Sequence, residues 1–348
     1  MAIVFDAPVS PGALTEFVRN VPSPDNLALL NAFPSVTNET NTINFAEIVK
    51  RNRTAKYRAF DGSISVSDRD TGSVSSVGMI PLSDSRNMGE YERLKLEFAR
   101  TGGTATGALA NAIYNDATDL TRNVQRRLEL AWGDVLADGV LTINENGLVG
   151  FEADFGVPAD QKVAPSGALW SNVTTSTPLS DLILWHDVYV AANGAPAGAI
   201  RTSQAVIRLV QKNKEIIDAV HGATSGKTRV TLTELNDLMA SEGLPAFAAP
   251  YELKLDVDGS FVRSIPTNRL LFTPADLGDL GHTEWGVTAT ALELVNSKEA
   301  EFGFEEAPGI VGVVEKIGPP YREFTYVDAV AMPVLDRAEA LLIATVTA

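Results

Sequence analysis

The feature that most constrains the fold of this chain is a long amphipathic segment in its first half. Apolar residues recur there at steps of three and four, as they do along one face of an α-helix: Ile113, Ala117, Leu120, Val124, Leu128, Ala131 and Val135. Gly139 follows the stripe, at a place where glycine commonly ends a helix. The pattern predicts one helix over residues 113–137, about 37 Å long at about 1.5 Å per residue. A shorter helix over residues 90–100 is predicted before it.

Alternating apolar and polar residues predict three β-hairpins. The first spans residues 57–82 around the turn Asp68-Arg69-Asp70-Thr71-Gly72, and it has little core of its own, so we expect it to lean on a partner surface. The second follows the long helix and turns at Asn146-Gly147; the third turns at Asp258-Gly259. Residues 324–335 and 340–346 are two further β-rich segments.

The chain of 348 residues is longer than a single hydrophobic core usually supports, which favours two lobes. Residues 158–180 are rich in Pro, Gly, Ser and Thr and read as the crossing into the second lobe. Helices are predicted there over 182–192 and 204–220, and Thr231 with Glu234 forms a capping box for a third helix that ends near Gly243.

Residues 1–45 alternate Pro, Asn, Ser and Thr with apolar pairs such as Leu29 and Leu30, which predicts an extended arm. An arm with this apolar content should lie on its own domain or on a neighbouring subunit.

Composition excludes several classes of protein. Cysteine is absent, so disulfides and thiolate metal sites are excluded. A formal charge of −16 argues against general nucleic-acid binding. The chain has neither a secretory signal pattern at its amino terminus nor an apolar run long enough for a membrane helix, and we expect it to be made in the cytoplasm.

The sequence contains only weak matches to motifs for nucleotide or metal binding. Gly222 to Thr228 approaches a phosphate-binding loop, but three residues rather than four separate Gly222 from Gly226, and a predicted helix rather than a strand precedes it. His186, His221 and His282 lie too far apart to place two metal ligands on one helical face. We therefore assign no catalytic residue, no cofactor and no metal site.

The one dense basic cluster lies at the junction of arm and first hairpin: Lys50, Arg51, Arg53, Lys56 and Arg58. A solvated face explains such a cluster as well as contact with an acidic patch on a neighbouring subunit does. We take this basic cluster as a candidate subunit contact, together with four apolar residues of the arm and hairpin: Leu29, Leu30, Met79 and Ile80.

Several strings, in collinear order, resemble the lambda-like capsid protein E family of tailed bacteriophages. They are VLADGVLTINENGLVGFEADFGVP at 135–158, IPTNRLLFTP at 265–274, GHTEWGVT at 281–288 and PPYREFTYVDAVAMPVL at 319–335. The resemblance covers most of the chain from about Tyr57 onward. It implies the α+β fold of HK97-like capsid proteins, in which an arm and a long hairpin called the E-loop precede a peripheral domain with a spine helix.

In these terms the expected arm is 1–45, the E-loop hairpin with its stem is 46–87, and the peripheral domain is 88–174, with the spine helix at 113–137 and a hairpin at 139–157. The axial domain is 175–320, and strands within 321–348 return to the peripheral domain. The resemblance implies a major capsid protein that self-assembles into hexamers and pentamers of an icosahedral shell around double-stranded DNA.

The resemblance also implies a separate scaffolding protein, because the chain lacks a long helical amino-terminal region, and it leaves room for a decoration protein. The virion is the expected location. Two alternatives remain open: an encapsulin-like compartment shell, and a cytosolic α/β nucleotide-binding enzyme whose only support is the near-match at Gly222 to Thr228.

Overall fold

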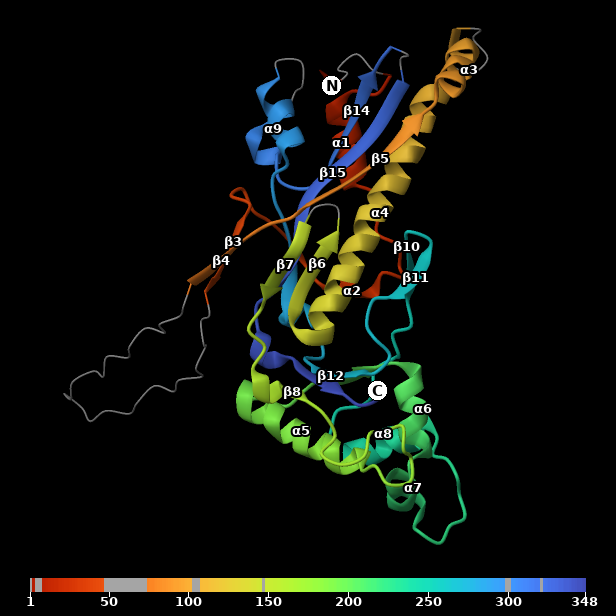
Figure 1. The fold of residues 1–348 in the computed structure, drawn as a ribbon, viewed down its shortest axis with the longest axis vertical. Coiled ribbons are helices and arrows are strands. Elements are labelled where there is room, and N and C mark those ends of the chain that lie inside the picture. Colours follow the sequence, from red (N-terminus) through yellow and green to blue (C-terminus); the bar gives the residue numbers. More distant parts are fainter. Residues whose placement is uncertain are drawn as a thin grey trace, which may run out of the picture.

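The computed structural model shows two lobes stacked along one long axis, which we call the upper and lower lobes after their places in Figure 1. It describes residues 2–3, 8–46, 74–101, 107–145, 148–297, 302–319 and 322–348. The helices are α1 (Pro11–Arg19), α2 (Ala28–Ala32), α3 (Glu90–Thr101), α4 (Ala108–Asp138), α5 (Pro178–Asn193), α6 (Gln204–Lys212), α7 (Lys214–His221), α8 (Leu232–Ser241) and α9 (Ala289–Asn296), with 3-10 turns η1 (Ala159–Gln161), η2 (Leu277–Asp279), η3 (Phe304–Glu306) and η4 (Ala338–Ala340).

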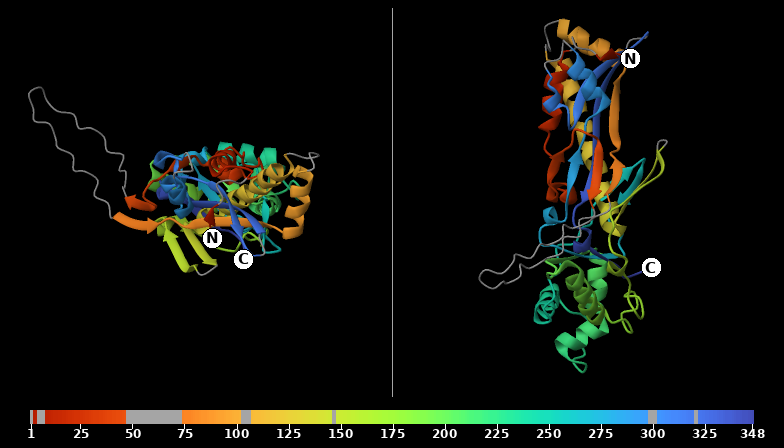
Figure 2. Two further views of the ribbon diagram at one scale, coloured as in Figure 1. Left: turned by 90° about the horizontal axis from the view of Figure 1, so that it is seen from above. Right: turned by 90° about the vertical axis from the view of Figure 1, so that its left-hand side faces the viewer.

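The strands are β1 (Ala2–Ile3), β2 (Ser35–Thr37), β3 (Thr42–Ala46), β4 (Val74–Gly78), β5 (Pro81–Met88), β6 (Val140–Glu145), β7 (Leu148–Asp154), β8 (Lys162–Val163), β9 (Ala199–Thr202), β10 (Lys254–Val257), β11 (Ser260–Arg263), β12 (Arg269–Thr273), β13 (Gly281–Trp285), β14 (Val311–Ile317), β15 (Arg322–Leu335) and β16 (Leu342–Thr345). The molecule is elongated, and Figure 2 shows from the side that the upper lobe is a tall, narrow slab above the helical lower lobe.

The predicted long helix is α4, which begins five residues earlier than its apolar stripe suggested. Six of the seven residues of the stripe are buried: Ile113, Ala117, Leu120, Val124, Leu128 and Val135 are each at most 3% exposed, and Ala131 is half-buried. Gly139 ends the helix in the left-handed region at φ 81°, and its N–H donates to the carbonyl of Val135. The fold-defining prediction from the sequence is therefore confirmed.

A six-stranded sheet covers α4 in the upper lobe, and β15 is its central strand. The first half of β15 lies between β14 and β5, and its last five residues pair with β13. β1 extends the sheet beyond β14, and β2 runs parallel to β13 at the other end. Val327 and Ala329 of β15 pack with Val124 and Leu128 of α4, which joins helix and sheet into one core.

The lower lobe combines a four-stranded sheet, in the order β8-β16-β12-β9, with helices α5 to α8. Its core holds the largest aromatic residues of the lobe: Trp170, Trp185, Tyr189 and Phe272. Trp170 donates its indole N–H to Asp181 at 2.9 Å, so this buried polar pair satisfies itself. The short strands β12 and β16 are apolar almost throughout, as expected for strands covered on both faces.

The amino-terminal segment differs from the predicted extended arm. It forms α1 and α2, which pack on the upper lobe of their own chain. Ser10 caps α1 and Pro11 occupies its first turn, which are ordinary signals for a helix start. Leu14 and Val18 then face the core, and Arg19 donates to the carbonyls of Ile310 and Pro308 at 3.0 and 3.1 Å.

The lobe boundaries also differ from the expected domains. β13, α9 and β14 were expected in an axial domain over 175–320, but they belong to the sheet and core of the upper lobe. β16 was expected to return to the peripheral domain, but it pairs with β12 and β8 in the lower lobe. The lobe to which each strand belongs depends on a pairing partner far along the chain, and the sequence of a short apolar strand does not indicate that partner.

The hairpin predicted after α4 is β6 with β7, and the turn at Asp258-Gly259 joins β10 to β11 with both residues at positive φ. Thr231 and Glu234 form the predicted capping box of α8. The helix predicted over 204–220 is instead divided at Asn213, which is fully buried and caps α7 while donating to Ser176. β4 and β5 fall in the second half of the hairpin predicted over 57–82, of which residues 57–73 lie outside the described residues. β4 pairs with β3, and β5 belongs to the large sheet.

Candidate functional site

The basic cluster of Lys50, Arg51, Arg53, Lys56 and Arg58 lies outside the described residues, as does the turn predicted at 68–72. The two described segments that flank them are antiparallel strands, in which Thr42 faces Gly78 and Ala46 faces Val74. This pair, β3 and β4, stands at the side of the upper lobe away from α3 (Figure 1). The chain therefore enters and leaves residues 47–73 at one lateral edge of the molecule.

The four apolar contact candidates are covered by their own chain. Leu29 and Ile80 are each 5% exposed in one core cluster, and half-buried Met79 packs against the same cluster. Leu30 is 9% exposed in the core beneath α4. We had expected these side chains to be buried mainly against other subunits. That expectation is corrected, because α2 and the start of β5 fold against α4 and the large sheet.

A buried carboxylate explains why α2 docks as it does. Glu129 of α4 is fully buried, and it accepts the backbone N–H groups of Leu29 and Leu30 at 3.1 and 2.7 Å. These are first-turn amides of α2, which have no acceptor within the helix. Tyr251 donates its hydroxyl to the same carboxylate. Glu129 thus joins the amino-terminal segment, the long helix and the segment before β10.

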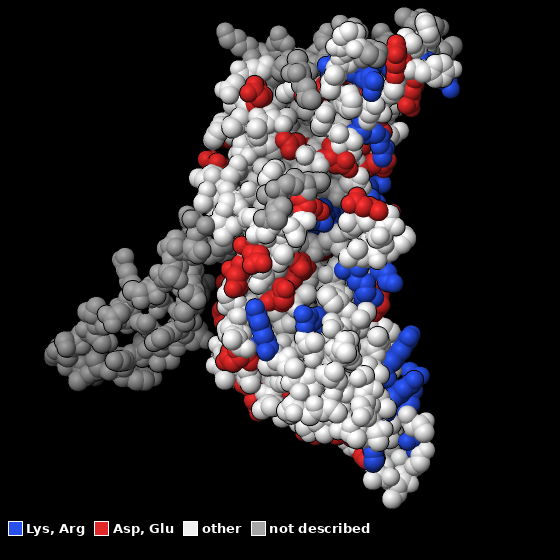
Figure 3. All heavy atoms as spheres, viewed as in Figure 1, with Lys and Arg blue, Asp and Glu red and all other residues white. Residues whose placement is uncertain are grey.

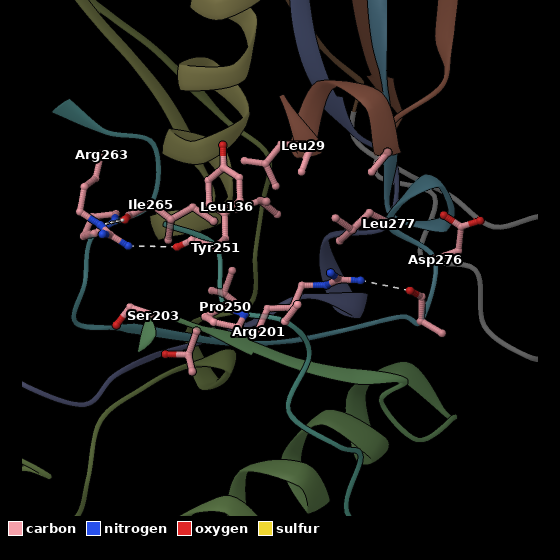
Figure 4. Close-up of a pocket in the computed structure, with 17 residues that line it drawn as sticks. Leu29, Leu136, Arg201, Ser203, Pro250, Tyr251, Arg263, Ile265, Asp276 and Leu277 are labelled. Atoms are coloured by element: carbon pink, nitrogen blue, oxygen red, sulfur yellow. Dashed lines mark hydrogen bonds between the residues drawn. The ribbon is translucent and has the colours of Figure 1, made fainter. Parts of the chain in front are cut away.

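A cavity of about 390 Å³ lies where the two lobes meet. Figure 4 shows Leu29 and Leu136 entering it from the upper lobe and Arg201 and Pro250 lining it from the lower lobe. Arg201 donates to the Ala275 carbonyl at 3.1 Å, and Arg263 donates to the Tyr251 carbonyl at 3.0 Å. These two hydrogen bonds therefore join chain segments that line the cavity. The lining is chiefly apolar and has no converging acid–base pair of the kind that catalysis requires.

Two surfaces expose apolar side chains that a protein normally buries. On α3, Tyr91, Leu94 and Phe98 are 84%, 47% and 71% exposed, and their spacing places them on one helical face. On β11, Phe261 is 75% exposed. Contiguous exposed apolar groups commonly mark contacts with other proteins. The stripe on α3 was not predicted, although its spacing is visible in the sequence, because its exposure depends on which face of α3 packs on α4.

Charge is distributed unevenly over the broad face in Figure 3. In the lower half, basic side chains gather along the right-hand border and acidic ones lie at the left, whereas both signs are mixed in the upper half. Several charged side chains of α4 form ion pairs within the chain. Arg127 pairs with Glu145 at 2.6 Å. Asp116 and Asp119 both pair with Arg86 at 2.9 Å, and these bonds raise the pKa of Arg86 further.

In the part of the chain that the structure describes, titratable residues do not converge into a reactive group. Within the described residues, no set of three His or acidic side chains is placed to hold a metal ion. Burial lowers the pKa of His186, whereas a 2.7 Å contact with Asp336 raises the pKa of His282. Gly222 to Thr228 forms an exposed loop after α7, so a helix precedes it, as predicted. None of the described helices combines the length and apolarity that crossing a bilayer requires.

Comparison with known proteins gives one family match. The family model described as phage major capsid protein E matches residues 10–346. No curated protein matches the chain significantly by sequence.

Two of the solved structures that match the chain illustrate the shared fold. A prophage protein of E. coli CFT073, whose description assigns it as a capsid protein, is 14% identical, with a TM-score of 0.60 over 95% of this chain and 97% of its own. A phage-related protein of Bordetella bronchiseptica RB50 is 13% identical, with a TM-score of 0.53 over 99% of this chain and 98% of its own.

Proposed function

Because the chain belongs to the phage major capsid protein E family, we propose that it builds an icosahedral head shell as hexamers and pentamers around double-stranded DNA. It is a shell-forming structural protein with the HK97-like fold, and it is not an enzyme. The observation that carries the proposal is the family match over nearly the whole chain, on a two-lobed fold shared with a capsid protein at a TM-score of 0.60. The same match favours a phage head over an encapsulin-like compartment.

We assign the upper lobe to the peripheral domain and the lower lobe to the axial domain, around which copies gather at the centre of each capsomer. The charge of the lobes supports this assignment. Residues 158–250, 266–275 and 340–348 contain eight basic and eight acidic residues, so the net charge of −16 resides in the rest of the chain. A neutral lobe avoids mutual repulsion where five or six copies crowd together.

The basic cluster at residues 50–58 is proposed to contact an acidic surface of the neighbouring subunit. The support for this contact is the position of the basic cluster in the chain: it lies between β3 and β4, which pair with each other at one lateral edge of the molecule. Subunits that each carry −16 repel one another unless opposite charges meet at their contacts. Within this proposal the apolar four, Leu29, Leu30, Met79 and Ile80, stabilise the subunit rather than the contact.

A separate scaffolding protein is proposed to direct assembly, and the shell offers a place for a decoration protein. The acidic subunit encloses DNA without sequence-specific binding, since a net negative surface repels phosphates. The protein is made in the cytoplasm of the bacterial host and ends in the virion.

Negative-stain electron microscopy of the purified protein, alone and after co-expression with the scaffolding protein, tests this function. Closed shells, or rings of five and six copies, are the expected products. A particle that stays monomeric in both preparations, at concentrations that cover the micromolar range, would contradict the proposal. Saturable binding of ATP by the monomer would instead support the enzyme alternative.

A further inference from the structure

The flat shape of the subunit places its lateral contacts on its narrow edges. Figure 1 views the molecule down its shortest axis, and the lobes lie above one another in that view. Subunits that tile a thin shell turn their broad faces inward and outward and meet through the edges. Opposite edges of the subunit must therefore be complementary where neighbouring copies touch.

One of these edges is basic. Arg208 and Lys212 are exposed one helical turn apart on α6, whose other face is buried through Val206, Ile207 and Val210. Arg229, which is also exposed, reaches Gln211 at 3.2 Å and so lies beside the end of α6. We call Arg208, Lys212 and Arg229 the basic edge.

The cations of the basic edge have no carboxylate partner within 4 Å among the described residues, although the chain has 44 acidic residues. The nearby carboxylates have closer partners, although the charge of Arg208 also helps to lower the pKa of Glu252. Glu252 pairs with Arg263 at 2.7 Å and accepts the Gln204 N–H at 2.7 Å, and Asp218 pairs with Lys214. The basic edge is thus open to a partner that supplies negative charge.

The opposite edge is acidic. Strand register places Asp154 opposite Val140 and Glu152 opposite Thr142, on the outward face of the hairpin, while Ala153 faces the core. Glu152 and Asp154 are exposed, and Asp160 on η1 follows them, with Lys162 as the only basic residue between 152 and 162. We call Glu152, Asp154 and Asp160 the acidic edge. In Figure 1, β7 and β8 lie on the left of the molecule and α6 lies on the right.

We propose that the basic edge of one subunit docks against the acidic edge of the next copy in the same capsomer. This inference rests on the proposed shell function and assigns the partner and polarity of one contact within it. A contact between two different edges is head-to-tail, and such contacts close into rings when the rotation between copies allows it. Charge complementarity at the contact also selects the correct neighbour over a reversed one.

Charge exchange between the edges tests the pairing. The double variant Arg208→Glu with Lys212→Glu, and the double variant Glu152→Lys with Asp154→Lys, should each fold but lose shell formation by about tenfold or more, because like charges then face each other. The quadruple variant restores opposite charges in the reversed order, so its shells should return. Circular dichroism confirms folding, and sedimentation with electron microscopy counts shells beside the wild type.

A matched control separates pairing from net charge. Arg208→Glu with Lys212→Glu can be combined with Glu39→Lys and Glu305→Lys, two exposed positions of the upper lobe, to restore the wild-type net charge. This control should remain defective. Normal shells from either double variant, rescue by the control, or failure of the exchanged quadruple variant would each overturn the pairing. If the wild type itself forms no shells, the shell function fails instead of the edge assignment.

Discussion

Two charged side chains, the exposed Arg19 and the buried Glu129, hold the amino-terminal segment on the upper lobe. Arg19 donates to backbone carbonyls of the segment before β14, and Glu129 accepts backbone N–H groups of α2. Burial lowers the pKa of Arg19, and nearby Glu306 partly opposes that effect. In both cases a long charged side chain satisfies backbone groups that would otherwise be buried without a partner. A segment with little regular structure of its own thereby acquires a defined place.

Replacing Glu129 with Ala should destabilise the subunit by about 2–4 kcal/mol, because two backbone amides and the Tyr251 hydroxyl lose their acceptor. Tyr251→Phe is the matched control, since it removes one of the three hydrogen bonds and should cost about 1 kcal/mol. Urea unfolding followed by circular dichroism measures both. Equal losses for the two variants would show that α2 does not depend on this carboxylate.

His282 should make subunit stability depend on pH. Its hydrogen bond to Asp336 raises its pKa in the folded state, burial opposes this, and nearby Glu284 adds to the increase. The folded state therefore favours the protonated ring, so the stabilisation is complete below the unfolded pKa of about 6.5 and is lost as pH rises through the raised folded pKa. Thermal unfolding across that interval should show a falling melting temperature, and Asp336→Asn should flatten the slope. An unchanged slope in that variant would contradict the assignment.

The long helix α4 is the element on which the other parts of the upper lobe are assembled. The large sheet, α1, α2 and the hairpin of β6 and β7 all contact it. The chain after β11 crosses it closely at Gly133, where an added Cβ would lie 2.1 Å from the Ser264 carbonyl oxygen. Glycine normally weakens a helix interior, so its presence here reflects the close approach of another segment.

Gly133→Ala should therefore destabilise the protein by about 1–3 kcal/mol, since the overlap involves backbone that cannot turn away. Gly12→Ala in α1 is the control: a Cβ there meets nothing within 4 Å, so the better helix propensity of Ala should stabilise by up to about 1 kcal/mol. Opposite signs in chemical denaturation are the expected result. A neutral or stabilising Gly133→Ala would mean that the crossing segment can move aside.

At the scale of the whole molecule, the net charge is separated from the lower lobe, which we propose to lie at the centre of each capsomer. The lower lobe is neutral, and the rest of the chain, which includes the basic cluster at residues 50–58, carries the excess of acidic residues. Each exposed ion pair contributes only about 0.5 kcal/mol, but the same contact recurs at every subunit of a shell. Because the contact is repeated at every subunit, the small free energies of the single ion pairs add up over the shell and favour assembly.

Arg53→Glu combined with Arg58→Glu should leave the subunit folded but impair shell formation and make it sensitive to salt, because surface changes cost little stability while the proposed contact changes sign. Circular dichroism reports the fold, and sedimentation in low and high salt reports the shells. The control is Lys95→Glu with Lys254→Glu, which makes the same change in charge at exposed positions. Shells indistinguishable from wild type would show that the basic cluster is a solvated face.

Local signals in the sequence were sufficient for α4, for the capping box at Thr231 and for the turn at Asp258-Gly259, because each depends on residues within about one helical turn or one hairpin of each other. The candidate contacts were less predictable. A pair such as Leu29 and Leu30 predicts that these side chains are buried but does not predict which surface covers them. The role of the basic cluster, which lies outside the described residues, remains a proposal from sequence.

Only the tertiary structure decided where those apolar groups go. Glu129 lies 100 and 99 positions from the amides that it binds, and Arg19 lies 291 positions from the Ile310 carbonyl. The break between α6 and α7 likewise depends on Asn213 meeting Ser176, 37 positions away. Short-range patterns record the conformation that a segment prefers, whereas the partner of a buried group is chosen among all surfaces that the fold brings near it.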